Sequence, residues 1–385
     1  MAGATKYVDN VNGNNGFSGD SPAQAYADVP TAIANISGGG NTVYIKNNGP
    51  SSPYQLTAAI ALTAGLKGDA TNGRNTFEGY TTTPGARDGR PTVTNAANSS
   101  NLITLNDNDY TVFRHIYFSH SASTRGGAFN AVTSGTTPLY VQDCVVDGCL
   151  GVFASVGFLN VVVLESVEVK NTTSVSAALL VQGAAYLYGC WIHNNPADGV
   201  RTTNGSTTTV YLEKCLVTSN GAVGVNDVSS SSGVAITVKD SVVWGNGGSG
   251  IRSAAKTSFS TTLDLSNTVF GANGAGGSGF NIECLDPQVE TDLNVRLTRR
   301  NFHYTSASGS YSGVAAGFDD VALTSDPFTS AASKDYSLNN ASGGGALVRG
   351  TAYPANFPGA AFTSYRDGGA VQHRDAGGAS AVAYW

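Results

Sequence analysis

A chain of 385 residues with a formal net charge of −6 is long enough for one large domain or two ordinary ones. It has 48 glycines, 12% charged and 41% apolar residues, a composition that favours strands joined by tight turns and excludes wholesale disorder. No cluster of Lys and Arg could neutralise a run of phosphates, and no apolar stretch reaches about 18 residues. The sequence therefore indicates neither nucleic-acid binding nor a membrane span.

The first 41 residues are predicted to form an N-terminal cap. Met1 to Asp9 show no basic region followed by an apolar core, so we expect either a signal removed earlier or release by another route, such as lysis. Ser21 and Pro22 are a favourable helix cap and first helical residue, which predicts a helix over residues 21–36. This helix would cover the open strand edge of the repeats that follow, and Pro30 should kink or divide it.

Residues 42–284 are predicted to form stacked coils. The segments 42–45, 91–94 and 102–105 have the β-branched and apolar residues of strands and are expected to be irregular coils. Residues 46–90 are rich in Gly, Pro and Thr, which predicts a loop excursion.

From about residue 110 to 281 the sequence repeats with a period of 22 to 29 residues. Apolar residues stand three and five positions before most repeat anchors, and two such positions point to the same side of a strand. Each repeat therefore opens with a strand that buries one face. The anchors are small or polar residues, namely His115, Cys144, Ser166, Cys190, Cys215, Ser241 and Asn267.

Asparagine recurs five residues after the anchor, at Asn171, Asn195, Asn220 and Asn246. Stacked asparagines at a turn can hydrogen-bond to the copies above and below. Three short strands and three turns per repeat describe one coil of a parallel β-helix, with a rise of about 4.8 Å per coil. A leucine-rich repeat fits worse because helix-period segments are missing, and a β-sandwich needs no fixed period.

The predicted fold class is all-β, a single right-handed parallel β-helix in which residues 285–385 form the last coils and an irregular closing segment.

Five cysteines and no CxxC pair argue against a disulfide framework or a structural zinc site. Three of them occupy the anchor column and are expected to stack as small buried hydrophobes: Cys144, Cys190 and Cys215. The sequence indicates no metal site and no cofactor.

Both ends of the chain carry further motifs. Near the start stand Tyr7-Val8-Asp9, Ser21-Pro22-Ala23 and Thr42-Val43-Tyr44-Ile45, and near the end Asp326-Pro327-Phe328, Asp335-Tyr336-Ser337-Leu338 and Asp367-Gly368-Gly369-Ala370-Val371. These segments resemble the cap, first coil and closing segment of the pectate-lyase-like right-handed β-helix proteins of bacteria and their phages. The resemblance implies a fold far more than a chemistry. Asp319-Asp320 is a DD pair, but the GHG motif of the family's hydrolases does not follow, and the lyases' acidic calcium ligands with a catalytic Arg or Lys are missing.

Residues at equal distances from the anchors should be neighbours on successive coils. One residue before the anchor, Asp143 and Glu165 would form a carboxylate pair. Such a pair can share a proton, bind Ca²⁺, or act as acid and base on a glycosidic bond. The alternative is an ordinary outer-face charge pair, relieved by Arg114 and solvent.

Two other groups are candidate sites. Eleven residues after the anchor, Arg201, Asn226 and Arg252 form a polar column that either receives an anionic saccharide or only keeps the strand soluble. His115 and His120, near Asp107 and Asp109, either form a metal or general-base site or serve as ladder and turn residues.

The leading functional hypothesis is a non-enzymatic structural or adhesive surface protein, a phage virion component of decoration, fibre or spike type. One alternative is a polysaccharide lyase or glycoside hydrolase of the depolymerase type, and another is a carbohydrate-binding module without turnover. The expected partners are copies of itself in a homotrimer, other virion or cell-surface proteins, and polysaccharide. The expected location is the virion or an extracellular surface.

Overall fold

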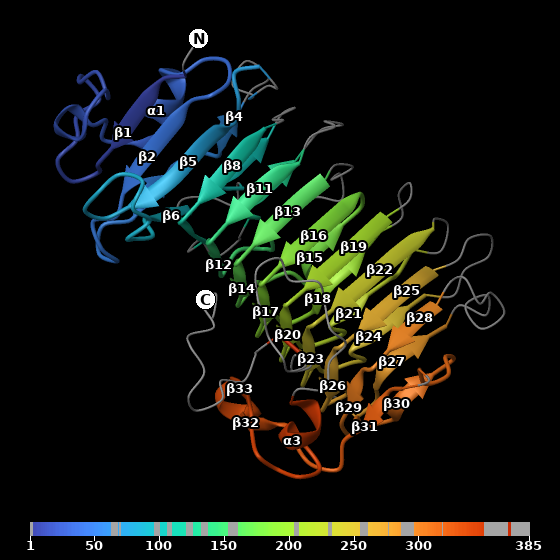
Figure 1. The fold of residues 1–385 in the computed structure, drawn as a ribbon. Helices are drawn as coiled ribbons and strands as arrows, with labels where there is room; N and C mark the ends of the chain where they lie inside the picture. The colour runs from blue at the N-terminus through green and yellow to red at the C-terminus, as the bar shows by residue number, and fades with distance from the viewer. Residues whose placement is uncertain are drawn as a thin grey trace. The chain divides into compact units, whose positions relative to one another are not determined.

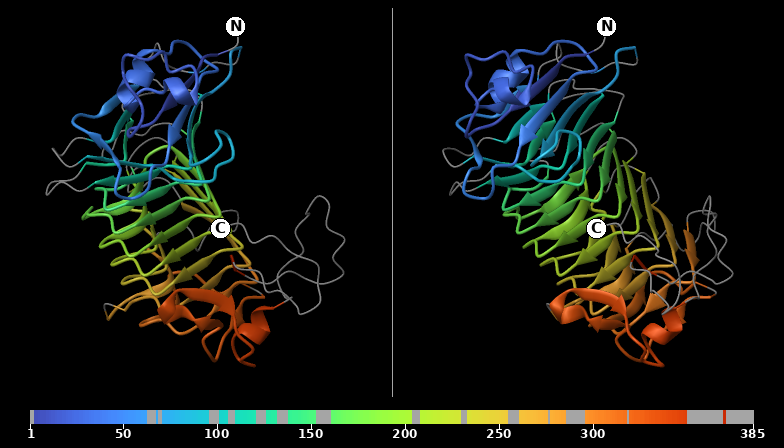
Figure 2. Two further views of the ribbon diagram at one scale, coloured as in Figure 1. Left: turned by 90° about the vertical axis from the view of Figure 1, so that its left-hand side faces the viewer. Right: turned by 60° about the vertical axis from the view of Figure 1, so that its left-hand side comes forward.

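The computed structural model has two compact units, residues 1–186 and 187–385. Both consist of parallel strands stacked coil upon coil, which confirms the parallel β-helix as the fold class (Figures 1 and 2). None of the helices in the described residues is long and apolar enough to cross a membrane. The structure describes residues 3–62, 68, 71–95, 101–105, 110–120, 126–131, 138–152, 161–203, 208–229, 233–254, 261–275, 277–285, 296–317, 319–349 and 369–370.

In each unit a coil contributes strands at up to three positions, which we call A, B and C in chain order. In the first unit the A strands pair in parallel in the order β1 (Thr5–Val8), β2 (Thr42–Lys46), β5 (Asn75–Tyr80), β8 (Thr111–Arg114), β11 (Leu139–Gln142) and β13 (Val161–Glu165). The B strands are β3 (Tyr54–Leu56), β6 (Thr92–Asn95), β9 (Tyr117–His120), β12 (Val145–Asp147) and β14 (Glu168–Lys170). The C strands are β4 (Ile60–Leu62), β7 (Ile103–Leu105), β10 (Phe129–Ala131) and, in the last coil of this unit, β15 (Ala177–Val181).

The loop excursion predicted over residues 46–90 is wrong. This segment contains β3, β4 and β5, and β3 and β4 are only three residues long, with the first and third residue of each buried. A strand of three residues shows a single alternation, which is too little for the sequence pattern to reveal among Gly, Pro and Thr.

The predicted N-terminal helix is divided into a 3₁₀ turn, η1 (Pro22–Gln24), and a short helix, α1 (Val29–Ala34). Ser21 makes no capping bond; instead the Asp28 carboxylate accepts a hydrogen bond from the Thr31 backbone N–H at 2.7 Å. Pro30 lies in the first turn of α1, where its missing N–H leaves no hydrogen bond unmade. Val29 and Ile33 of α1 line a small apolar interior space together with Ile45, Phe77 and other core residues.

In the second unit the A strands are β19 (Thr208–Glu213), β22 (Val234–Lys239), β25 (Thr261–Ser266) and β28 (Arg296–Arg299). β16 (Ala184–Tyr188), also an A strand, spans the boundary between the units. The B strands are β17 (Trp191–His193), β20 (Leu216–Thr218), β23 (Val242–Trp244), β26 (Val269–Gly271), β29 (Phe302–His303) and β31 (Val321–Ala322). The C strands are β18 (Asp198–Thr202), β21 (Val225–Asn226), β24 (Ile251–Ser253), β27 (Phe280–Cys284) and β30 (Gly309–Ser312).

Two residues separate most A strands from the B strand that follows, and the first of them has a left-handed backbone. His115, Ser166 and Asn267 are such turn residues, with φ between 51° and 54°. Cys144, Cys190, Cys215 and Ser241 come one residue later, where the next strand is about to begin. The repeat alignment was therefore off by one residue at three anchors, because the turn and the anchor both accept small or polar residues.

Asparagine side chains form a continuous hydrogen-bonded ladder in the second unit. Asn195 Nδ2 donates to Asn220 Oδ1 at 2.8 Å, Asn220 Nδ2 to Asn246 Oδ1 at 3.0 Å, and Asn246 Nδ2 to Asn273 Oδ1 at 3.0 Å. All four are buried. Asn171 does not belong to this ladder: it is an exposed left-handed turn residue that donates to the Asp147 carboxylate. The ladder prediction is thus confirmed for three of its residues and corrected for Asn171, whose repeat was aligned one residue too early.

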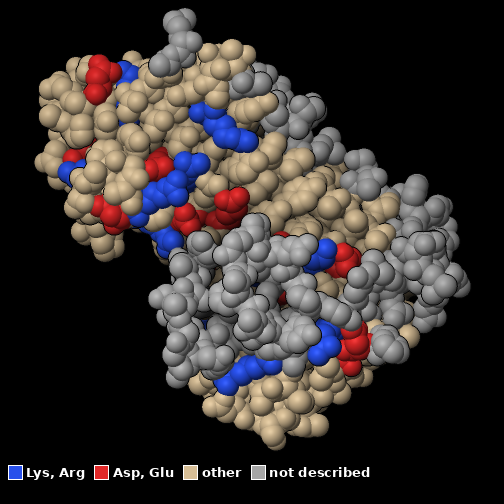
Figure 3. Space-filling view, viewed as in Figure 1, with Lys and Arg blue, Asp and Glu red and all other residues tan. Residues whose placement is uncertain are grey.

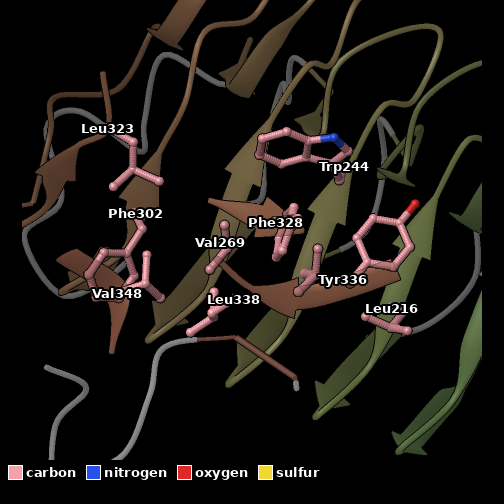
Figure 4. Close-up of a cluster of buried hydrophobic side chains, with 10 residues drawn as sticks. Leu216, Trp244, Val269, Phe302, Leu323, Phe328, Tyr336, Leu338 and Val348 are labelled. Carbon is pink, nitrogen blue, oxygen red and sulfur yellow. The ribbon is translucent and has the colours of Figure 1, made fainter. Parts of the chain in front are cut away.

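The segment after β31 packs against the outer face of the B strands of the second unit. It contains β32 (Phe328–Ser330), η3 (Ala331–Ser333), β33 (Asp335–Leu338), which pairs antiparallel with β32, and α3 (Gly345–Val348). Figure 4 shows its buried side chains interleaved with those of the B strands, in a cluster that includes Leu216, Trp244, Val269, Phe302, Phe328, Tyr336, Leu338 and Val348. The C-terminal motif residues therefore serve packing, while Asp367, Gly368 and Val371 lie outside the described residues.

We expect Asn220→Gly to lower the free energy of unfolding by about 2–3 kcal/mol, because it removes the two side-chain hydrogen bonds that join Asn220 to the buried amide groups of Asn195 and Asn246. Asn171→Gly is the matched control, with an expected change under about 1 kcal/mol at an exposed left-handed position. Urea unfolding followed by circular dichroism measures both. Equal losses in the two variants would contradict the role of the ladder.

Candidate functional site

Asp143 and Glu165 do not face each other. In the pairing of β11 with β13, Gln142 is opposite Glu165, and Gln142 Nε2 donates to Glu165 Oε2 at 2.6 Å. Asp143 is the next residue, in the left-handed turn, with its carboxylate 4.0 Å from His115 Nε2. The predicted in-register pair is therefore wrong by one residue, since Ser166 is the equivalent of Asp143. A catalytic role for either carboxylate stays a prediction.

The two histidines of this region occupy different places. His115 is a turn residue rather than a ladder anchor, and burial lowers its pKa although the nearby Asp143 opposes this. His120 ends β9 and is buried. Asp107 and Asp109 lie outside the described residues. Within the part of the chain that the structure describes, no group of His, Cys, Asp and Glu could hold a metal ion.

The cysteines of the anchor column are buried thiols. Cys144, Cys190 and Cys215 have almost no exposed surface, and no cysteine forms a disulfide. Burial raises the pKa of Cys144 to about 12 and also raises that of Cys215. Thiols that stay protonated in the core are poor nucleophiles, in agreement with the packing role predicted for them.

Asp320 of the DD pair belongs to a partly buried polar layer that the sequence did not reveal. Tyr311 Oη donates to Asp320 Oδ2 at 2.6 Å and lies 2.7 Å from His303 Nε2. Burial lowers the pKa of His303, so its ring is neutral near pH 7 and Nε2–H can donate to Tyr311. Burial opposes ionisation of Asp320, but the His303 ring 3.8 Å away and the hydrogen bond from Tyr311 lower its pKa to about 2. The His303 ring also stacks on Phe270, so this layer packs within the core.

The polar column predicted on the C strands lies in register. Arg201 pairs with Asn226, Asn226 with Arg252, and the column continues to Glu283 on β27. The residue before each member is a fully buried aliphatic side chain, at Val200, Val225, Ile251 and Ile282. Since successive residues of a strand point to opposite sides, the column lies on the outer side of β18, β21, β24 and β27.

Two carboxylates join this column. Asp198 Oδ2 accepts a hydrogen bond from Asn226 Nδ2 at 2.8 Å, Asp198 Oδ1 accepts one from the Val223 backbone N–H at 2.9 Å, and Arg201 Nη1 lies 3.6 Å away. On the next coils, Glu283 Oε2 accepts a hydrogen bond from Ser249 Oγ at 2.7 Å and lies 3.5 Å from Arg252 Nε. We call Asp198, Arg201, Asn226, Ser249, Arg252 and Glu283 the C-strand face.

The C-strand face contains an unsatisfied acceptor and a carboxyl group with a perturbed pKa. Asn226 is 6% exposed, and its Oδ1 has no hydrogen-bond partner among the described residues. Asp198 is 3% exposed, and burial raises its pKa although Asn226 and Arg201 favour the charged form. Sequence reasoning found the column eleven residues after the anchors but missed Asp198 and Ser249, which stand eight residues after theirs, and Glu283, which stands sixteen after Asn267.

Charge on the molecule is sparse. In the view of Figure 3, acidic and basic side chains lie next to each other, and those it colours form no broad patch of one sign. The C-strand face follows the same rule, since each arginine has a carboxylate within 3.6 Å.

No protein-family model and no curated protein matches the chain. Among solved structures, pectate lyase Pel9A matches with a TM-score of 0.57 over 97% of both chains, at 15% sequence identity. A rhamnogalacturonan lyase matches with a TM-score of 0.49 at 12% identity, over 80% of this chain and 75% of its own. At such identities the likeness establishes the fold alone, and at that level it confirms the resemblance to pectate-lyase-like proteins.

We expect Arg201→Gln to raise the pKa of Asp198 further, because the guanidinium 3.6 Å away favours the carboxylate. The folded pKa lies above the unfolded value of about 3.9. The free energy of unfolding therefore decreases as the pH rises from the unfolded pKa through the folded pKa of Asp198, and it decreases more in the variant. A ¹³C NMR titration of the Asp198 carboxyl measures the pKa. Lys239→Gln on an A strand is the control, and an unshifted pKa in Arg201→Gln would refute the arrangement.

Proposed function

We propose that the protein binds a glycan chain on its C-strand face and acts without turnover. The observation that carries this proposal is the in-register column of Arg201, Asn226 and Arg252, in which the buried Asn226 Oδ1 has no donor among the residues that the structure describes. A buried carbonyl oxygen without a partner costs about 1–3 kcal/mol. A sugar hydroxyl placed there would remove that cost.

The spacing and charge of the column support an extended, uncharged glycan. Neighbouring coils are about 4.8 Å apart, which is close to the length of one sugar residue in an extended chain, so each coil would present its polar groups to one residue. Arg201 and Arg252 are balanced by Asp198 and Glu283, which leaves no excess charge to attract an acidic chain. This proposal replaces the anionic saccharide expected from the sequence with an uncharged one.

A second candidate function is glycoside hydrolysis. Glycosidases use one protonated and one ionised carboxyl group on either side of the scissile bond. Asp198 has a raised pKa and accepts a hydrogen bond from Asn226 on the next coil. Glu283 contacts Arg252, which lies on the coil that follows Asn226. These two carboxyl groups are the candidates for that pair, with Asp198 as the acid.

The two functions are separated by binding and turnover measured on one panel of neutral polysaccharides, with polygalacturonate as the acidic comparison. Arg252→Ala should weaken binding of the preferred glycan at least about tenfold, since a charged hydrogen bond contributes about 1.5–3 kcal/mol. Lys239→Ala is the matched control: Lys239 has similar exposure and lies 3.1 Å from Asp264. Equal losses of glycan binding in the two variants would refute the C-strand face as the binding site.

Release of reducing ends that stops in both Asp198→Asn and Glu283→Gln would replace the binding proposal by hydrolysis. Turnover that persists in both variants would assign the chemistry to another part of the molecule.

The wider role that we propose is that of a surface protein, on a phage particle or a cell, whose β-helix displays this face. We expect the purified chain to be a homotrimer by size-exclusion chromatography with light scattering, at three times the 39.3 kDa of one chain. Antibodies against the protein should label purified virions or intact producer cells. If the chain is a monomer and the antibodies label neither virions nor cells, this role is refuted. The proposal of glycan binding does not depend on that outcome.

A further inference from the structure

Basic side chains from two separate segments meet at the end of β8 in the first unit. Arg114 ends β8 and His115 follows it, while Arg87 and Arg90 belong to the loop between β5 and β6. We call these four residues the arginine cluster. Figure 3 shows basic and acidic side chains gathered beside one another over the first coils.

The loop that carries Arg87 and Arg90 is held by Asp88. One oxygen of this carboxylate accepts the Thr81 backbone N–H at 2.6 Å and the other accepts the Thr82 backbone N–H at 2.9 Å. These hydrogen bonds lower the pKa of Asp88, so the loop stays closed at neutral pH. The two exposed arginines are therefore displayed from an ordered loop.

Carboxylate and backbone carbonyl groups orient the guanidinium groups, but some of the guanidinium N–H donors remain unused. The buried Glu78 carboxylate lies 3.8 Å from Arg87 Nε and 3.7 Å from Arg114 Nη1. Arg90 Nε donates to the Asp143 backbone oxygen at 2.9 Å. Among the described residues, the terminal nitrogens of Arg87 and Arg90 have no hydrogen-bond acceptor, and both side chains face solvent.

Unused arginine donors and one buried atom favour an anion. The three guanidinium groups are balanced in charge by Glu78, Asp143 and Asp88, but the Asp88 carboxylate accepts its hydrogen bonds from Thr81 and Thr82 and from no arginine, so the terminal donors of Arg87 and Arg90 remain available. His115 Nδ1 is buried without a hydrogen-bond partner in the described part of the chain. A bound anion would favour the charged form of this ring, which then takes a proton from water and adds a further donor.

We propose that the arginine cluster binds a sulfate-type oxyanion, either carried by a glycan or free. Guanidinium groups recognise such anions through paired N–H donors. A carboxylate offers two oxygens in one plane, whereas a sulfate ester offers three around a tetrahedron, which suits donors that arrive from a loop and from a strand. This site lies in the first unit and does not depend on the C-strand face of the second.

The test measures binding of sodium sulfate and of dextran sulfate to the full chain by calorimetry, with dextran as the uncharged comparison. Arg87→Gln/Arg90→Gln should weaken binding of both anions at least about tenfold. Lys170→Gln/Lys334→Gln removes the same charge elsewhere and should change neither. Arg87→Lys/Arg90→Lys keeps the charge and should also weaken binding, because lysine lacks the planar pair of donors.

Tighter binding of dextran sulfate than of sulfate, at equal sulfate concentration, would identify the glycan as the ligand, and equal binding would identify the free anion. No binding by the wild type, unchanged binding by Arg87→Gln/Arg90→Gln, or full binding by the lysine variant would each overturn the proposal. A thermal unfolding midpoint like that of the wild type shows that the exposed loop changes leave the fold intact.

Discussion

Each coil depends on the alignment of its strands with those of the coil before it. The backbone N–H and C=O groups of a parallel strand find their partners only on adjacent strands, so an error of one residue would reverse which side chains face the core. In the second unit, Val210 pairs with Ile236 and Ile236 with Leu263, all fully buried. The asparagine ladder fixes the same alignment at the turns, since the amide nitrogen of each asparagine donates to the side-chain oxygen of the next coil.

The same alignment creates the surfaces from which function is proposed. A strand that buries every second residue must display the residues between them, and stacking brings those residues into files one coil apart. On the C strands this places Arg201, Asn226, Arg252 and Glu283 in line, and the carboxylate of Asp198 reaches the line from a neighbouring position. The arginine cluster arises differently, because a long loop returns to the end of β8 and is held there by Asp88.

The C-terminal segment packs on the outer side of the B strands of the second unit. The B strands of the second unit carry apolar residues on their outer side as well, and β32, β33 and α3 cover them. Trp244 stacks on Tyr304 and meets Phe328 edge to face. The second unit therefore has an apolar cluster outside its coils in addition to the core within them, whereas its C strands keep a polar outer face.

Local sequence determined the parts of this protein that a repeating pattern encodes. Apolar alternation before each anchor predicted the buried strands, and recurring asparagine predicted a ladder that Asn195, Asn220 and Asn246 form. Only tertiary structure decided the alignment of single residues, because turn and anchor accept the same residue types; this separated Asp143 from Glu165 and Asn171 from the ladder. It also decided which distant groups meet, such as Asp198 with Asn226 and Arg87 with Glu78, since these contacts depend on how turns and loops of unequal length return to the coil.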